Sequence, residues 1–165
     1  MNTEVRIVPI AKAHIDGYRA VLDEVARERR YLGMVQAPPL EDVRDYVMRN
    51  IASRTPHYVA LAGDEVVGWC DVMPKWQATL KHGAALGIGV ARSWRGKGIG
   101  MRLLEATLRQ AKEAGLTRIE LTVRVDNENA KRLYEKFGFV VEGLCRRQVL
   151  IDGRYIDSYL MARLD

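Results

Sequence analysis

The sequence predicts one α/β (α+β) domain over residues 1–165, with a mixed, mostly antiparallel sheet of about seven strands, about four helices and a central parallel βαβ crossover. Two observations carry this prediction. Segments with strand periodicity and segments with helix periodicity are interleaved along the chain. A length of 165 residues suits a single domain with a sizeable core, and no repeat, low-complexity stretch or linker interrupts it.

The first half of the chain should supply a strand, two helices and a hairpin. Residues 4–10 have the pattern of a short strand, and residues 57–74 that of two strands joined at Gly63-Asp64. Four apolar residues spaced 3, 4 and 3 apart predict the first helix: Ile15, Tyr18, Leu22 and Val25. A second helix should begin after Pro39. Its predicted buried residues are Val43, Tyr46, Val47 and Ile51.

The second half should supply the crossover, a short helix and a final hairpin. Strand patterns at residues 84–90 and 118–125 enclose a helix, so this unit should be a right-handed parallel crossover. The inward residues predicted for that helix are Met101, Leu104, Leu108 and Ala111. A short helix should begin after Asn127 and end near Gly138. Its predicted inward residues are Ala130, Leu133 and Phe137. A hairpin with its turn at residues 151–153 should end the chain.

Charge and composition exclude several classes of protein. The net charge is +5, but the basic residues are dispersed, without a basic block or an aromatic-interleaved basic strand, so we expect no nucleic-acid partner. No apolar run approaches the roughly 20 residues of a membrane span, and the N-terminus lacks the apolar block of a signal peptide, so we expect no membrane partner. Cys70 and Cys145 have no C-x-x-C spacing and no nearby His cluster, so we expect no metal site and a reducing, cytoplasmic location.

A glycine-rich turn lies between the strand at residues 84–90 and the following helix, where residues 95–100 read RGKGIG. Unpaired amides at a helix N-terminus, glycines without a Cβ and flanking basic side chains suit an anion such as phosphate. A P-loop would need Lys and then Ser or Thr after its last glycine, where Met101 and Arg102 stand, and a dinucleotide fingerprint would need G-x-G-x-x-G. A purely structural glycine turn is a further alternative.

Two motifs follow one another in this part of the chain. Arg95, Gly98 and Gly100 match the pattern (Q/R)-x-x-G-x-(G/A), and residues 127–139, NENAKRLYEKFGF, match N-x-x-A-x-x-L-Y-x-x-x-G-F. Together they resemble the GNAT superfamily of N-acetyltransferases, whose pyrophosphate-binding turn and later signature have this order and separation. The resemblance is close over residues 84–140, fits the C-terminal strands, and before residue 81 holds only in the order of elements.

The resemblance implies direct transfer of an acetyl group from acetyl-CoA, bound as co-substrate, to an amine. It assigns acetyl-CoA binding to the end of one strand, the glycine turn and the start of the short helix: Ile88, Gly89, Val90, Arg95, Gly96, Lys97, Gly98, Ile99, Gly100, Met101 and Asn127. Tyr134 aligns with the general acid that protonates the departing sulfur. The same residues also have structural interpretations: Tyr134 packed in the core, Asn127 capping a helix, and strand glycines that allow close packing.

The group that takes the proton of the amine is left open. Some family members have Glu where Thr122 stands, and many have an acid where Ala84 and Ala85 stand; Glu120, His82 or a water relay are the candidates. A lysine amine near pKa 10.4 costs about 4.6 kcal/mol to deprotonate at neutral pH, and an α-amine near pKa 8 about 1.4 kcal/mol. The missing base therefore favours an amine of low pKa.

The acceptor is predicted to be a small-molecule amine or an amino acid. The resemblance places acceptor sites at the first two helices, their loop and the final hairpin. Aromatic residues and acids there suit a cationic amine, although they also suit a core and a solvated surface: Tyr31, Tyr46, Trp76, Tyr155 and Tyr159, with Glu28, Glu41, Asp71 and Asp157. A peptide N-terminus, as in ribosomal-protein-type acetyltransferases, and a non-catalytic acyl-CoA-binding sensor are the alternatives. A homodimer is an expectation at the level of the family.

Overall fold

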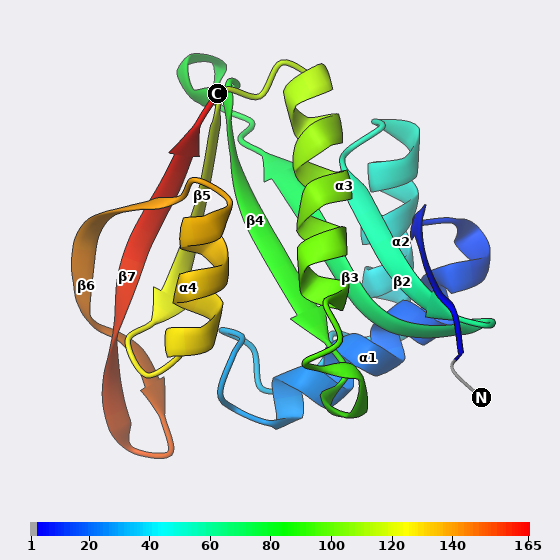
Figure 1. The fold of residues 1–165 in the computed structure, drawn as a ribbon, viewed down its shortest axis with the longest axis horizontal. Helices are drawn as coiled ribbons and strands as arrows, with labels where there is room; N and C mark the ends of the chain where they lie inside the picture. Colours follow the sequence, from blue (N-terminus) through cyan, green and yellow to red (C-terminus); the bar gives the residue numbers. More distant parts are fainter. Residues whose placement is uncertain (1–2) are drawn as a thin grey trace.

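The computed structural model of the protein describes residues 3–165, which form one seven-stranded sheet flanked by four α-helices (Figure 1). The strands are β1 (Val5–Pro9), β2 (His57–Ala62), β3 (Glu65–Pro74), β4 (Gly83–Val90), β5 (Arg118–Arg124), β6 (Val140–Ile151) and β7 (Arg154–Leu164). The helices are α1 (Ile15–Arg27), α2 (Leu40–Ala52), α3 (Ile99–Glu113) and α4 (Glu128–Lys136). Single 3-10 turns lie at Lys12–His14, Ala78–Leu80 and Arg92–Trp94.

The sheet confirms the predicted fold class. Its strand order is β1-β2-β3-β4-β5-β7-β6, and each pair of neighbours is antiparallel except β4 and β5. α3 connects these two parallel strands, which is the predicted βαβ crossover. The turn between β6 and β7 has positive φ at Asp152 and Gly153, as a two-residue hairpin turn requires.

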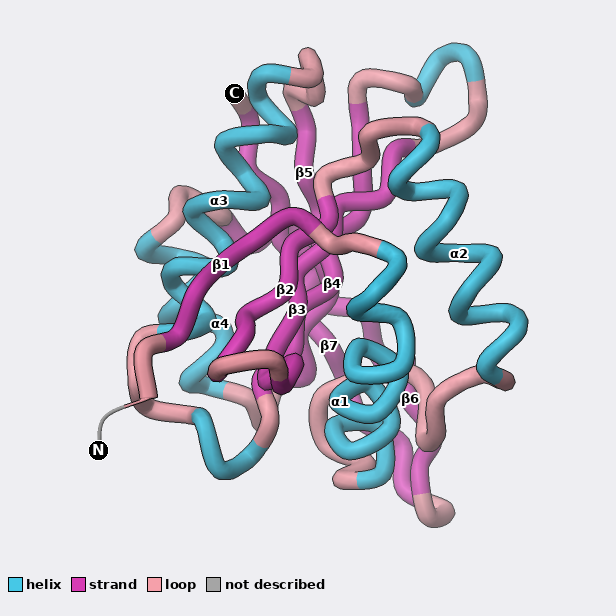
Figure 2. Tube along the Cα trace, turned by 90° about the vertical axis from the view of Figure 1, so that its right-hand side faces the viewer, coloured by secondary structure: helices cyan, strands magenta, loops and turns pink. Residues whose placement is uncertain are grey.

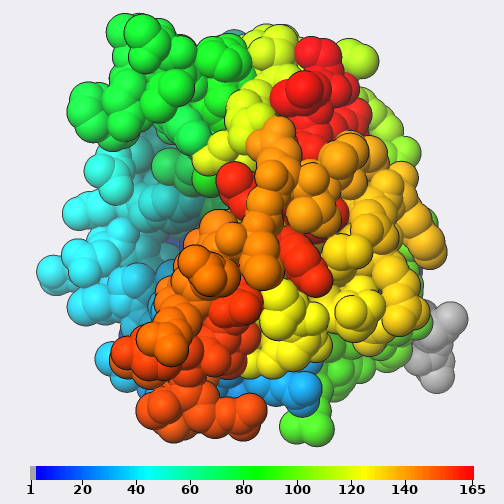
Figure 3. Space-filling model, turned by 90° about the vertical axis from the view of Figure 1, so that its left-hand side faces the viewer, coloured from blue at the N-terminus to red at the C-terminus, as the bar shows by residue number. Residues whose placement is uncertain are grey.

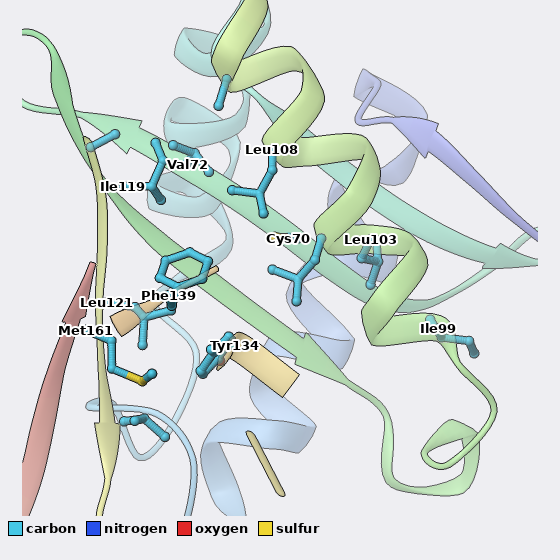
Figure 4. Close-up of a cluster of buried hydrophobic side chains, with 14 of the residues drawn as sticks. Cys70, Val72, Ile99, Leu103, Leu108, Ile119, Leu121, Tyr134, Phe139 and Met161 are labelled. Carbon is cyan, nitrogen blue, oxygen red and sulfur yellow. The ribbon is translucent and has the colours of Figure 1, made fainter. Parts of the chain in front are cut away.

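The helices cover opposite faces of the sheet, so the protein has two cores (Figures 1 and 2). α3 and α4 pack on one face and α1 and α2 on the other. β3 serves both, because successive side chains of a strand point to opposite sides: Cys70 and Val72 join the α3/α4 core, whereas Trp69 joins the α1/α2 core. Figure 4 shows the first of these cores, with Leu103 and Leu108 of α3 above the sheet.

Two predicted core positions are wrong. Ile51 of α2 is 38% exposed, and Asn50 is buried in its place because its amide contacts the ring of His57 at 3.2 Å. Met101 of α3 is 47% exposed, because the buried stripe of that helix starts at Ile99 and includes Leu103. In α4 the predicted inward residues are half-buried and pack against the α3/α4 core: Ala130, Leu133 and Phe137. Tyr134 is buried more deeply, with its ring against Phe139.

β4 and β5 separate along their length, and this separation creates the site. They pair only at Gly83–Arg118, Ala84–Ile119 and Ala85–Glu120. Beyond these pairs β4 stays bonded to β3 as far as Val90, while β5 stays bonded to β7. The two strands therefore diverge like a V (Figure 1), and the edge of β4 that faces β5 carries backbone groups without a partner strand. Among residues 3–165, no helix combines the length and the apolar composition needed to cross a membrane.

Candidate active site

A cavity of about 550 Å³ lies at the open end of the V, between β4, the glycine turn and α4. Most of the predicted site residues line it: Ile88, Gly89, Val90, Arg95, Gly96, Gly98, Ile99, Gly100, Met101, Asn127 and Tyr134. Lys97 is the predicted site residue that does not. Residues that the sequence did not single out complete the lining: Val25, Trp94, Asn129, Ala130 and Leu133, together with Tyr31, which had been assigned to the acceptor. Asn129, Ala130 and Leu133 belong to the second motif, which could have indicated them.

The glycine turn presents free backbone amides to this cavity. Gly96 and Gly98 have φ values of +73° and +75°, a left-handed conformation that glycine adopts without strain, and α3 starts directly after Gly98. The N–H of Arg102 is the first of the helix to be bonded, to the carbonyl of Gly98 at 3.2 Å, and within residues 3–165 the amides from Gly96 to Met101 donate no hydrogen bond. A helix start with unbonded amides is a site for a phosphate-like anion.

Arg95 is held by a carboxylate rather than left free for an anion. Its guanidinium donates to both carboxylate oxygens of Glu28, at 2.9 and 2.5 Å, and to the carbonyl of Val90 at 2.9 Å, and it stacks on the ring of Tyr31 at 4.6 Å. The hydrogen bond from Arg95 lowers the pKa of Glu28. Arg95 therefore ties the glycine turn to the end of α1. The ammonium group of Lys97 lies over the ring of Trp94, at 4.6 Å from its centre.

Gly87 and Gly89 of β4 make room for side chains of β3. A Cβ on Gly89 would lie 2.2 Å from the ring of Trp69, and a Cβ on Gly87 would lie 2.8 Å from Oδ1 of Asp71. A side chain at position 89 would collide with the Trp69 ring, and one at position 87 would require the Asp71 carboxylate to move, because real Cβ atoms do not approach other atoms so closely. The sequence had offered strand disruption or close packing as reasons for these glycines, and close packing against cross-strand neighbours is what the structure shows.

Tyr134 and Asn127 come from the second motif. Asn127 accepts a hydrogen bond from the N–H of Ala130 at 3.3 Å, so it caps α4 while it also lines the cavity. The Tyr134 ring, seen between β4 and β5 in Figure 4, is 8% exposed. Burial, and then the neighbouring Cys70, raise the pKa of its hydroxyl well above the usual value. A phenol in this state stays protonated at neutral pH and can donate a proton.

The two candidate bases lie at the closed end of the V. Glu120 is paired with Lys75 at 2.5 Å and with Arg118 at 3.2 Å, and the hydrogen bond from Lys75 lowers its pKa. His82 stands before β4, and its carbonyl accepts the N–H of Thr117 at 2.9 Å. Neither residue lines the cavity. A carboxylate that is held in two ion pairs and has a lowered pKa is a weak proton acceptor, and this disfavours Glu120.

A second polar group lies on the α1/α2 face of the sheet. Asp71 is 6% exposed and accepts a short hydrogen bond from the hydroxyl of Tyr46, and burial raises its pKa to about 6. The sequence named both residues among the acceptor candidates but could not pair them, because they come from β3 and α2. Of the other candidates, Trp76 is 84% exposed and Tyr155 58% exposed. No group of three His, Cys, Asp or Glu side chains in residues 3–165 is arranged to hold a metal ion.

Comparison with known proteins identifies the family. The chain is 30% identical over 160 residues to the L-amino acid N-acetyltransferase AaaT of Escherichia coli, covering 95% of this chain and 98% of the relative. It is 36% identical over 116 residues to the N-alpha-acetyltransferase RimI of Mycobacterium tuberculosis, covering 70% of each. Its fold matches the structure of yncA, a putative acetyltransferase of Salmonella typhimurium solved with acetyl-CoA, with a TM-score of 0.92, 16% identity, and coverage of 98% of this chain and 94% of the other. The model of the family described as "Acetyltransferase (GNAT) family" matches residues 19–139, so the chain belongs to the GNAT family of acetyltransferases.

Proposed function

We propose that the protein is an acetyl-CoA-dependent N-acetyltransferase whose acceptor is the primary amine of an L-amino acid or of another small molecule. One observation carries this proposal: a single cavity joins the unbonded amides of the glycine turn, the open edge of β4 and the protonated hydroxyl of Tyr134. These are the groups that a thioester of coenzyme A needs for its diphosphate, its extended arm and its departing sulfur.

The residues present fit coenzyme A. The amides from Gly96 to Met101 suit the two negative phosphates, since they point out of the start of a 15-residue helix. The separated edge of β4 at Ile88–Val90 offers N–H and C=O groups to an amide-containing arm, much as an added strand would. Asn127 lines the same cavity. These assignments rest on shape and on hydrogen-bonding capacity.

The chemistry follows from this placement. The nitrogen of a neutral amine attacks the thioester carbonyl carbon, a C–N bond forms, and the C–S bond breaks. Tyr134 gives its proton to the departing sulfur, which avoids the release of a free thiolate into a largely apolar cavity. The phenol of Tyr134 carries its proton at neutral pH, and the burial that raises its pKa would also make a free thiolate in the same cavity a stronger base, so the sulfur can take that proton.

The acceptor class is supported by the extent of the similarity to the relatives. The likeness to AaaT, an L-amino acid N-acetyltransferase, spans 95% of this chain, whereas that to RimI, an N-alpha-acetyltransferase, spans 70%. Both names describe acetylation of an amine, and an α-amine loses its proton more easily than a lysine side chain. Acetylation of a peptide N-terminus is therefore the second candidate.

A two-part experiment tests the proposal. Calorimetry should detect binding of acetyl-CoA to the purified protein, and release of free thiol should follow when an L-amino acid or a small amine is added. A panel that also contains short peptides ranks the two acceptor classes by kcat/KM. Binding without thiol release for any amine would identify a non-catalytic sensor, and absence of binding at millimolar acetyl-CoA would contradict the whole proposal.

A further inference from the structure

A buried carboxylate and the cavity lie on opposite sides of the same stretch of sheet. Cys70 and Asp71 are neighbours on β3, and their side chains point to opposite faces. Cys70 lies in the α3/α4 core with Tyr134, whose pKa it influences. Asp71 lies on the α1/α2 face, beside Gly87 of β4. Both residues lie opposite the part of β4 that no longer pairs with β5, where Cys70 pairs with Ile88 and Asp71 with Gly87.

The surroundings of Asp71 leave its charge without a cation. Three titratable side chains from three elements surround it: Tyr18 of α1, Tyr46 of α2 and His57 of β2, which stands directly opposite it in the sheet. Tyr46 donates to it, and within residues 3–165 no Lys or Arg forms an ion pair with it. Burial lowers the pKa of His57 to about 3, so this ring is neutral. A carboxylate that is almost fully buried without a counter-charge is costly, and a cationic ligand would relieve that cost.

Asp71 is 6% exposed and lies on the α1/α2 side of the sheet. Its Oδ1 lies 2.8 Å from the place where a Cβ of Gly87 would stand, so the carboxylate fills the space that this glycine leaves beside β4. Ala85 is exposed although it is the last residue of β4 that pairs with β5, and Gly87, which lies beyond that pairing, is half-buried. Figure 3 shows a hollow on this side of the molecule, bounded by the cyan residues of α2, the green β3–β4 segment and the orange to red β6–β7 hairpin.

We propose that Asp71 is the proton acceptor of the reaction: it binds the incoming ammonium group on the α1/α2 face and removes its proton before attack. The inference rests on the proposed function. Ala85, one of the two residues that stand where the resemblance leads one to expect an acid, points to the same face of the sheet as Gly87 and Asp71. The amine would enter from one face while the sulfur is protonated by Tyr134 from the other.

The protons balance in this scheme. The ammonium group brings three protons. One passes to the Asp71 carboxylate, one stays on the amide nitrogen of the product, and one is lost from that nitrogen as the C–S bond breaks. Tyr134 gives its own proton to the sulfur, recovers one of the two released protons, and the other leaves to solvent.

The test uses Asp71→Asn and two amines that differ in basicity. For the preferred α-amine, kcat should fall roughly 10²–10⁴-fold, the range expected for loss of a general base. For hydroxylamine, which is already neutral near neutral pH, the fall should be at least tenfold smaller, because no proton has to be removed before attack. Calorimetry should show unchanged binding of acetyl-CoA. Glu120→Gln is the matched control, a carboxylate that is already paired with Lys75 and Arg118 exchanged for an amide, and should leave both rates close to those of the unmutated protein.

The pH profile separates a base from a structural residue. In the unmutated protein, kcat/KM should fall below the pKa of Asp71, about 6, and be flat above it. In Asp71→Asn this plateau should vanish, and kcat/KM should keep rising up to the pKa of the amine itself. Tyr46→Phe removes a hydrogen bond that lowers the pKa of Asp71, so its acidic limb should move to higher pH while the protein stays active.

The outcomes distinguish the two proposals. An unmutated protein that releases no thiol with any amine overturns the proposed function, and this inference with it. An active protein overturns this inference alone if Asp71→Asn keeps full activity, loses equal activity with both amines, or loses acetyl-CoA binding. If Asp71→Asn fails to fold, an acidic limb that stays in place in Tyr46→Phe overturns the inference.

Discussion

On the α3/α4 face of the sheet the candidate site is built mainly from backbone, whereas on the α1/α2 face it is built from side chains. The α3/α4 face offers the free amides of Gly96 to Met101 and the unpaired edge of β4. These groups all come from one contiguous stretch of about a third of the chain. The second face brings together Tyr18, Tyr46 and Asp71 from three separate elements. The groups proposed to hold the cofactor therefore come from local backbone geometry, whereas those proposed to receive the acceptor are brought together by long-range packing.

The largest expected effect comes from Tyr134→Phe, which tests whether the two faces have separate roles. Turnover should fall roughly 10²–10⁴-fold, since the general acid is lost, while acetyl-CoA binding is unchanged. The ring of phenylalanine keeps the packing on Phe139, whose centre lies 5.8 Å away, so the fold should persist. Steady-state thiol release and calorimetry measure the two quantities. Full turnover in this variant would show that the sulfur leaves without help from α4.

The next effect tests whether the two cores unfold together. Leu103 of the α3/α4 core is 0% exposed and Leu22 of the α1/α2 core is 6% exposed. Each leucine changed to alanine should lower the free energy of unfolding by about 2–5 kcal/mol, with Leu22→Ala at the lower end. Because β3 contributes to both cores, a single cooperative transition is expected in urea for both variants. Two separate transitions in either variant would contradict the prediction that the two cores unfold as one cooperative unit.

Much of the fold could be predicted because its signals are local. The alternation over residues 118–124 and the spacing along α1 identify elements, and strand–helix–strand order then fixes the parallel crossover. The divergence of β4 from β5 had no such signal, since it depends on how distant strands pair. On α4 the periodicity identified the side that meets the core, since Ala130, Leu133 and Phe137 pack against it, but it did not show that Tyr134 is the residue buried most deeply.

The candidate site also has a part that local motifs predicted and a part that depends on contacts between distant segments. The glycine turn and Tyr134 were named from motifs within one stretch of sequence, and their residues line one cavity. The residues that bond to these site residues from distant parts of the chain were not predicted from the sequence. Arg95 meets Glu28 across 67 positions, and Asp71 meets Tyr46 across 25 positions. A carboxylate that will be buried or ion-paired looks like any surface acid until the chain folds.

A smaller effect tests the backbone character of the α3/α4 face. Gly98→Ala should cost about 1–2 kcal/mol, the penalty for an L-residue in the left-handed conformation found there. No atom lies within 4 Å of the added Cβ, so the loss would reflect backbone strain and not collision. The thermal unfolding temperature and the affinity for acetyl-CoA should both be lower in this variant. Gly33→Ala is the control: its Cβ also meets nothing within 4 Å and its φ is not positive, so a change within about 0.5 kcal/mol is expected. Equal losses in both variants would contradict the assignment.

The smallest effect concerns the ion pair that joins the two faces. Glu28→Gln removes the carboxylate that holds Arg95, and it should lower stability by about 0.2–1 kcal/mol, because the pair is partly exposed. The folded-state pKa of Glu28 is lowered, so its stabilisation is present above the unfolded value of about 4.3 and is lost as the pH falls through the folded value. The two proteins should therefore differ in stability at neutral pH and converge in acid.

Asp23→Asn supplies the matched control for that pair. Asp23 bonds Arg27 within α1 at 2.7 Å and also has a lowered pKa, but it does not touch the glycine turn. Both variants should lose a little stability, whereas only Glu28→Gln should weaken acetyl-CoA binding, because Arg95 is then free to move with the turn. If calorimetry finds the same affinity in both variants, α1 and the turn are mechanically independent, and the two faces are coupled through the sheet alone.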